Sequence, residues 1–273
     1  MVLRVLVEPE LFADADTLGA AAASLVADRI AGHPAGSSFL LGCPGGRSAL
    51  TTFGHLADLV TADRLDLSRV VIVMMDEYVV DGPDGARVAV DPAAAHSCRR
   101  FGREEILGRL NAGLPTGHRI RPVNLWVPDP AAPDRHERRI VAAGGVAVFL
   151  LASGAGDGHI AFNSPGADRA SRTRLVDLPD TTRRDNLATF PSFGGYLAAV
   201  PPYGVTVGIA TIADTSAEAV MLVHGADKRT VADRLRSAQT YDPSWPATIV
   251  TECRHPHLFV DRAACPDLLT VNT

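Results

Sequence analysis

The chain has 273 residues, of which 26 are Lys or Arg and 31 are Asp or Glu, giving a formal net charge of -5. This mildly acidic balance, without a run of basic residues, argues against nucleic acid or an anionic membrane as a main partner. No stretch approaches the roughly 18 continuous apolar residues of a membrane span, and the apolar start is too short for a signal peptide. The four cysteines form no CxxC pair, which fits a reduced cytoplasm. We expect a cytoplasmic enzyme or small-molecule binder.

Short β-branched runs alternate with longer helical stretches along the chain. In chain order they predict strands at residues 2–7, 38–42, 70–75, 146–151, 205–212, 219–223 and 258–260, and helices at 16–31, 48–60 and 227–237. Thr17 is the expected cap of the first helix. This alternation predicts an α/β fold, in which an open, mainly parallel sheet is covered by helices on both faces.

Two segments fit this pattern poorly. Residues 80–96 are rich in Gly, Pro, Asp and Ala, and residues 164–202 are polar. Because no repeat and no Pro-, Gly- or Ser-rich linker divides the chain, we expect residues 1–273 to form a single domain. Long irregular segments in a compact domain are usually functional, and we expect a lid at about residues 164–202.

Three loops follow predicted strands, and ligands of open α/β sheets bind at the carboxyl ends of strands. The first loop, residues 42–48, contains Gly45, Gly46, Arg47 and Ser48 before a helix. The glycines let backbone N–H groups approach an anion, and the Arg and Ser side chains add donors. This pattern is typical of a phosphate site, although a plain tight turn has the same glycines.

The second and third loops carry candidate proton-transfer groups. Asp76 and Glu77 end a strongly apolar strand, where a dry environment raises a carboxyl pKa and suits a general base; an Asp that caps the next turn is the alternative. Asp157 and His159 lie two residues apart in a Gly-rich loop, where the carboxylate can orient the imidazole and stabilise its charged form.

Lys228 is the only lysine, since the other 25 basic residues are Arg. It lies at a predicted helix start, where a cation is unfavourable to the helix dipole unless it binds an anion there. Chance survival of one Lys on a solvated face is the alternative.

Together these motifs resemble the glucosamine-6-phosphate deaminases, in the superfamily that also contains the 6-phosphogluconolactonases. The resemblance extends from about residue 38 to residue 260 and rests on residues 75–79 (MDEYV), 157–163 (DGHIAFN), 171–174 (SRTR) and 222–228 (LVHGADK). Lactonases typically have Asp-Glu-Arg where this chain has Asp76, Glu77 and Tyr78, so the motif favours the deaminases.

The resemblance implies a modified Rossmann-like sheet that binds no dinucleotide, and an isomerase or deaminase acting on a sugar phosphate. It implies that His159, assisted by Asp157, moves a proton at the ring oxygen to open the pyranose. Asp76 would then carry a proton between C2 and C1, turning an aldosamine into a ketose with loss of ammonia. Lys228 matches a phosphate-binding lysine, and no metal or other cofactor is required.

Three positions depart from the resemblance. Ser164 stands where the deaminases have a Glu, and Ala188 where they have a phosphate-binding Arg, while Arg47 replaces a Gly of the phosphate loop. Without the Glu, His159 loses one source of stabilisation for its charged form. We hypothesise that Arg47 replaces the missing guanidinium, with Arg183 and Arg184 as rival candidates.

Other functions remain open at this point. A lactone hydrolase would share the phosphate site and the Asp157–His159 loop, and a non-catalytic sugar-phosphate sensor would tolerate Ser164. Cys253, His255 and His257 have alternate spacing, but a single loop without a fourth ligand is a weak metal signal, and we expect no metal site. The sequence does not fix which sugar phosphate is used or the number of subunits, so a homo-oligomer stays open.

Overall fold

The structure is a computed structural model that describes residues 6–270, except for the side chains of Ala188, Leu269 and Thr270. Its main sheet has the strand order β1-β11-β10-β7-β2-β3-β6, and all of its recorded pairings are parallel. The strands are β1 (Pro9–Phe12), β2 (Phe39–Cys43), β3 (Val70–Met74), β6 (Leu125–Trp126), β7 (Val146–Leu151), β10 (Ser216–Val223) and β11 (Pro256–Asp261).

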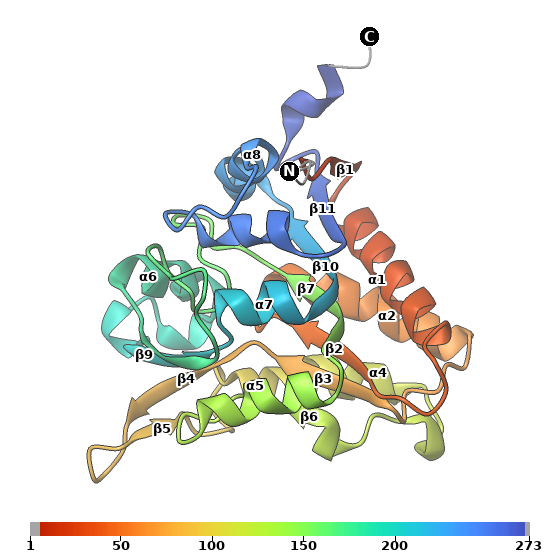
Figure 1. Cartoon of the computed structure of the whole chain (residues 1–273), viewed down its shortest axis with the longest axis horizontal. Coiled ribbons are helices and arrows are strands. Elements are labelled where there is room, and N and C mark those ends of the chain that lie inside the picture. Colours follow the sequence, from red (N-terminus) through yellow and green to blue (C-terminus); the bar gives the residue numbers. More distant parts are fainter. Residues whose placement is uncertain (1–5, 271–273) are drawn as a thin grey trace.

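Helices cover both faces of this sheet (Figure 1). One face carries α1 (Ala15–Ala31), α2 (Leu50–Ala62) and a helical run from α3 (Cys98–Phe101) through a π-helical segment to α4 (Arg109–Ala112). The other face carries α5 (Pro133–Ala142), α7 (Ile209–Thr215) and α8 (Arg229–Ser237). Alternate strand residues bury into the two layers: Ile72 faces the first, and Val71 and Val73 the second. The predicted α/β fold is therefore confirmed.

The second sheet is antiparallel, in the order β5-β4-β9-β8. Its strands are β4 (Asp76–Asp81), β5 (Arg87–Ala89), β8 (Arg174–Asp177) and β9 (Tyr203–Thr206). Of the segments predicted as irregular, residues 80–96 contribute β5 and the end of β4, and residues 164–202 contribute β8 and also contain α6 (Asp180–Thr189). An apolar cluster that includes Tyr78, Phe162, Phe190 and Phe193 packs beside this sheet. The prediction was therefore wrong for β5, β8 and α6, because short strands paired over an aromatic cluster leave little apolar periodicity in the sequence, whereas residues 82–86 and 90–96 lie outside helices and strands as predicted.

Three local predictions differ from the structure. Residues 2–7 lie mostly outside the described part, and residues 6–8 are not in a strand. The side chain of Asp14, rather than Thr17, accepts the N-terminal hydrogen bond of α1, from the Thr17 N–H at 2.8 Å. The predicted strand at 205–212 divides into β9 and α7, because a fully buried apolar run has the same composition in a strand as in a helix.

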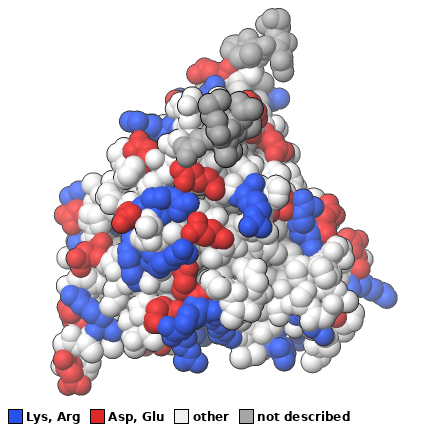
Figure 2. Space-filling view, viewed as in Figure 1, with Lys and Arg blue, Asp and Glu red and all other residues white. Residues whose placement is uncertain are grey.

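The surface carries no dominant charge on the face shown in Figure 2, where basic and acidic side chains are interspersed. Among residues 6–270, no helix is both long enough and apolar enough to cross a membrane.

Close packing of β2 against β7 fixes the strand end that leads into the first predicted loop. A Cβ at Gly42 would overlap the ring of Phe149, whereas a Cβ at Gly54 on α2 would meet nothing within 4 Å. We expect Gly42→Ala to destabilise the protein by about 1–3 kcal/mol through overpacking, and Gly54→Ala to stabilise it by about 0.5–1 kcal/mol. Urea unfolding of the two variants measures this difference, and equal effects would contradict it.

Candidate functional site

The predicted site loops meet at one edge of the main sheet, beside the switch point between β2 and β7. The chain runs from β2 outward to β3 and β6, and then returns to β7 on the other side of β2. Such a switch point opens a crevice at the carboxyl ends of the strands. Here it is a cavity of about 510 Å³. Its lining contains every predicted site residue except Asp157: Gly45, Gly46, Arg47, Ser48, Asp76, His159 and Lys228.

Asp76 lies where the chain leaves β3 for β4, and so at the junction of the two sheets. Only 6% of this residue is exposed, and the Sγ of Cys98 donates a hydrogen bond to its Oδ1 at 3.2 Å. Burial raises the pKa of Asp76 to about 7, even though the bond from Cys98 acts in the opposite direction. This carboxyl group can therefore accept and return a proton near neutral pH.

Glu77 is turned away from the cavity and anchors α3. Its carboxylate accepts hydrogen bonds at 2.9 Å from the Ser97 hydroxyl and from the N–H groups of Tyr78, Cys98 and Arg99. These bonds hold the N-terminus of α3 beside β4, which brings the Cys98 thiol to Asp76. The two adjacent acids thus have different roles, one structural and one facing the cavity.

Asp157 and His159 form the hydrogen-bonded pair that the sequence predicts. Nδ1 of His159 lies 2.6 Å from Oδ1 of Asp157, whose other oxygen accepts from the Thr182 hydroxyl at 2.8 Å. Although burial opposes it, these bonds lower the pKa of Asp157 to about 2, so this carboxylate stays ionised. A Cβ at Gly154 would overlap the imidazole, and Gly158 has φ +67° beneath the ring of Trp245. Glycine is therefore required at both positions.

Lys228 and Arg47 form the cationic end of the cavity. The Lys228 ammonium donates to the Ser153 carbonyl at 2.6 Å, and burial lowers the pKa of Lys228. Arg47 is close enough to act on that pKa in the same direction. An anion bound between the two would relieve their repulsion, so this end fits a phosphate group.

Residues 13–259 match the family described as glucosamine-6-phosphate isomerases/6-phosphogluconolactonase. The chain belongs to this family. It is 34% identical over 238 residues to the glucosamine-6-phosphate deaminase of Beutenbergia cavernae, covering 84% of this chain and 81% of the relative. The corresponding deaminase of Porphyromonas gingivalis (strain ATCC 33277) is 33% identical over 270 residues, covering 97% and 94%. The resemblance inferred from the motifs is therefore confirmed.

Solved structures of both branches of the family share the fold. A monomeric glucosamine-6-phosphate deaminase superposes with a TM-score of 0.81 at 23% identity, over 95% of this chain and 99% of that one. The 6-phosphogluconolactonase from Leishmania guyanensis superposes with a TM-score of 0.70 at 15% identity, over 97% and 99%.

Arg183 and Arg184, the alternatives to Arg47 as replacement for the phosphate-binding Arg that Ala188 lacks, differ in position. Arg183 donates to the carbonyls of Leu197 and Val200 at 2.7 and 2.9 Å, which places it inside the lid segment. Arg184 lines the cavity and lies 3.7 Å from Asp180, with 61% of its side chain exposed. Arg47 and Arg184 therefore stay as candidates for contact with a phosphate, and Arg183 does not.

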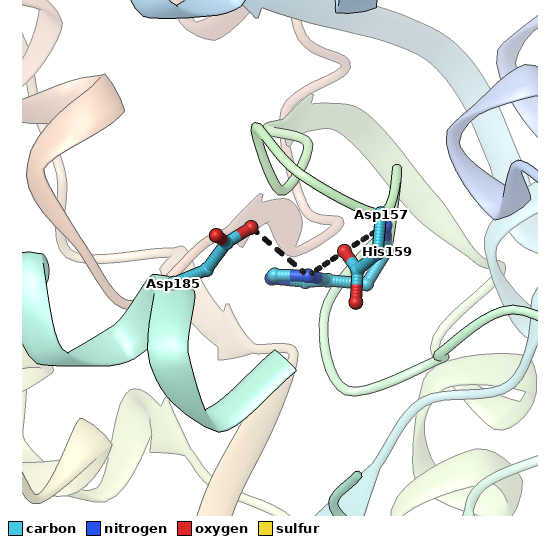
Figure 3. Close-up of side chains that lie close together, drawn as sticks. All are labelled: Asp157, His159 and Asp185. Atoms are coloured by element: carbon cyan, nitrogen blue, oxygen red, sulfur yellow. Dashed lines mark hydrogen bonds and ion pairs between the residues drawn. The ribbon is translucent and has the colours of Figure 1, made fainter. Parts of the chain in front are cut away.

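Helix α6 contributes three side chains to the site that the sequence did not predict. Besides Arg184, the side chains of Asp185, Asn186 and Thr189 line the cavity. Asp185 projects from α6 toward the His159 ring (Figure 3), with its Oδ2 3.9 Å from Nδ1. The N–H of Gly156 donates to the same oxygen at 3.1 Å. No sequence signal pointed to Asp185, Asn186 or Thr189, because α6 itself lies in the segment predicted as irregular.

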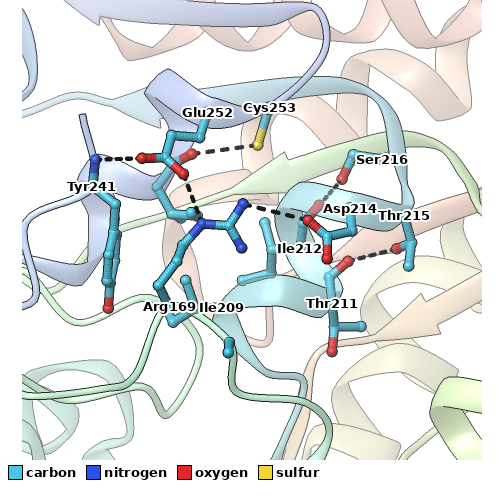
Figure 4. A network of polar contacts seen from close by, with 12 residues as sticks. Arg169, Ile209, Thr211, Ile212, Asp214, Thr215, Ser216, Tyr241, Glu252 and Cys253 are labelled. Atoms are coloured by element: carbon cyan, nitrogen blue, oxygen red, sulfur yellow. Dashed lines mark hydrogen bonds and ion pairs between the residues drawn. The ribbon is translucent and has the colours of Figure 1, made fainter. Parts of the chain in front are cut away.

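The Ser-Arg-Thr-Arg motif (residues 171–174) connects the start of segment 164–202 to helices α7 and α5. Ser171 accepts from the first N–H of α7 at 3.0 Å, and the Thr173 hydroxyl donates to Glu137 on α5 at 2.8 Å. Beside it, Arg169 bridges Glu252 at 2.7 Å and Asp214 at 3.3 Å (Figure 4). These contacts give the motif a structural role outside the cavity.

One group of side chains in the described part is spaced like a metal site, and it is not the predicted weak candidate. Donor atoms of Asp157, His159 and Asp185 lie within 4.8 Å of one another. Because Nδ1 of His159 already forms a 2.6 Å hydrogen bond to Asp157, we interpret the group as a proton-relay arrangement. By contrast, Cys253 donates to the Ile249 carbonyl and His257 contacts Glu218 at 2.8 Å, so these two residues have separate partners.

The thiol of Cys98 stabilises the ionised form of Asp76. We expect Cys98→Ala to move the pKa of Asp76 above its value of about 7, because the carboxylate loses its hydrogen-bond donor while it stays buried. Cys98→Ser keeps a donor and should leave the pKa lower than in the Ala variant. Carbon-13 NMR titration of labelled aspartate, assigned with Asp76→Asn, measures the shift. Cys253→Ala, at another buried cysteine, is the control, and an unchanged pKa in Cys98→Ala would contradict this role.

Proposed function

We propose that this protein converts glucosamine 6-phosphate and water to fructose 6-phosphate and ammonia. The observation that carries the proposal is that one cavity is lined by a buried carboxyl group with a pKa of about 7, by an imidazole that is hydrogen-bonded to a carboxylate behind it, and by two cations. The names of relatives that are about one-third identical over most of their length support the same reaction.

The phosphate binds first, at the cationic end. Lys228 and Arg47 provide charge, and the Ser48 hydroxyl and the turn containing Gly45 and Gly46 provide donors. This contact fixes one end of the sugar, so the reacting carbons are held in a defined position relative to the other end of the cavity.

Ring opening follows at His159. The imidazole takes the proton of the C1 hydroxyl and delivers a proton to the ring oxygen as the C1–O5 bond breaks, which gives the aldehyde. Asp157 holds the ring orientation and stabilises the charged imidazole, since it stays ionised at neutral pH.

Asp76 then carries out the isomerisation. Its carboxylate takes the C2 proton of the open aldosamine, giving an enol-amine, and returns a proton to C1. The resulting C2 imine adds one water and releases one ammonia, which leaves the ketose. The pKa of about 7 suits both halves of this transfer, because the group must act as a base and then as an acid.

Three assays distinguish this reaction from the other functions open to the family. Glucosamine 6-phosphate is incubated with the protein, and fructose 6-phosphate and ammonia are measured by coupled detection. Formation of both in equal amounts supports the proposal. Hydrolysis of 6-phosphogluconolactone without either product would replace it with a lactonase, and binding without turnover would replace it with a sensor.

Asp76→Asn separates catalysis from stability. Without the base, we expect kcat to fall by at least about 100-fold. Because the pKa of Asp76 is about 7 in the folded protein and near 3.8 in the unfolded chain, wild-type stability falls as the pH rises through this window. The Asn variant should therefore unfold at higher urea concentration than wild type at about pH 8, with the difference lost near pH 4. A variant that is inactive but no more stable at pH 8 would contradict the buried-carboxyl argument.

Arg47→Ala tests the cationic end. We expect KM for the sugar phosphate to rise by roughly 10- to 100-fold, with a smaller effect on kcat, because a charge-assisted contact to phosphate is lost. Arg184→Ala is the matched variant, since Arg184 lines the same cavity from the exposed side. Steady-state kinetics of both variants show which of the two arginines binds the phosphate. A larger rise of KM in Arg184→Ala than in Arg47→Ala would mean that Arg184 binds it instead of Arg47.

A further inference from the structure

Position 164, where the resemblance to the deaminases implies a Glu, contains a serine in this chain. The hydroxyl of Ser164 lies 2.9 Å from that of Thr182, which in turn donates to Asp157 at 2.8 Å. Ser164 therefore supports Asp157 through a neutral chain of hydroxyls and adds no negative charge. A second carboxylate would add to the stabilisation that Asp157 gives a charged imidazole in this partly buried position, and it has to come from another element.

Helix α6 presents such a charge on the same face as Thr182. Thr182 and Asp185 are three residues apart, so both side chains project from one side of the helix. Thr182 contacts Asp157, and Asp185 lies 3.9 Å from Nδ1 of His159. The Gly156 N–H, which donates to Asp185 at 3.1 Å, holds this carboxylate against the catalytic loop. The exposed fraction of its side chain is 27%, so water screens the charge only in part.

We propose that Asp185 is a positioning residue for His159 and supplies from α6 the second carboxylate that position 164 lacks. This inference rests on the proposed function for its catalytic consequence, but the contact itself does not. The Asp185 carboxylate stabilises the protonated imidazole when His159 takes up a proton during ring opening. Asp157 keeps the direct hydrogen bond and fixes the ring orientation.

Several charged groups face His159, and Asp185 differs from each of them. Asp157 belongs to the same loop, and Asp76 acts on the site from the start of β4. Lys228 interacts electrostatically with both Asp157 and Asp185. The remaining charged side chains of the cavity lining are Arg47, Arg184 and Asp227. Of these acids, Asp185 alone comes from the lid segment, so the counter-charge depends on the docking of α6.

The test compares Asp185→Asn with Asp177→Asn, which removes an exposed carboxylate from the same segment. With glucosamine 6-phosphate, we expect kcat of D185N to fall by about 10- to 100-fold with little change in KM, and D177N to behave like wild type. A rise in KM alone would mean that Asp185 binds the substrate, and an unchanged kcat would mean that it has no role; either result overturns the proposal.

Rescue provides the sharper control. Ser164→Glu introduced into D185N returns a carboxylate from the other side of Thr182, and we expect it to recover most of the lost kcat. Thermal melting checks that each variant is folded, and Asp185→Ser replaces D185N if the Asn variant is not. Failure of S164E to restore any activity to a folded D185N would contradict a role for Asp185 as a counter-charge.

A substrate-independent measurement separates this inference from the proposed function. In protein labelled with nitrogen-15 histidine and assigned with His159→Asn, the ring-nitrogen chemical shifts of His159 should change in D185N and stay unchanged in D177N, because of these two carboxylates only Asp185 lies against the ring. If wild type does not convert glucosamine 6-phosphate, the proposed function is wrong, and this spectrum still decides the role of Asp185. Identical ring-nitrogen shifts in D185N and wild type would overturn it.

Discussion

The site depends on the burial of one carboxyl group at the junction of two sheets. Asp76 is the first residue of β4, and the chain passes there from a parallel sheet into an antiparallel one. Burial at this junction raises its pKa to about 7, which opposes folding above the ordinary pKa of an aspartate. The neighbouring Glu77 compensates in part, because its hydrogen bonds fix α3 and deliver the Cys98 thiol. Local backbone strain adds to the cost, since Ala161 lines the same cavity at φ +50°.

Residues 164–202 add the side chains of α6 to the cavity and contact the rest of the chain at separate places. The contacts of Ser171 and Thr173 hold the start of this segment, and the aromatic cluster around Phe190 and Phe193 holds its end. Between them, α6 directs Thr182 toward Asp157. The hydrogen bonding of the Asp157–His159 pair therefore depends on the position of α6, because the Thr182 hydroxyl on this helix donates to Asp157. The loop that contains the pair does not supply this donor itself.

The sequence predicts the parallel sheet and the residues at its strand ends, because buried strands have strong apolar runs and ligands bind where those strands end. Asp76, His159 and Lys228 could be found in this way. Cys98 and Asp185 could not, because each reaches the site through tertiary contacts: Cys98 through the anchoring of α3 by Glu77, and Asp185 through a polar helix without clear periodicity. The single-domain expectation stays a prediction.

The positions that depart from the family pattern, 47, 164 and 188, are ones where a charged side chain is gained or lost. They are not the positions proposed to transfer protons. An electrostatic contribution falls off slowly with distance and has weak directional demands, so different elements around one cavity can supply it. Arg47 in the loop after β2, and Asp185 on α6 in our proposal, are charges of this kind. A group that exchanges a proton with the substrate must lie within hydrogen-bonding reach and in a defined direction. In the mechanism that we propose, charges can therefore come from different elements of this fold, whereas Asp76 and His159 have to remain at the ends of β3 and β7.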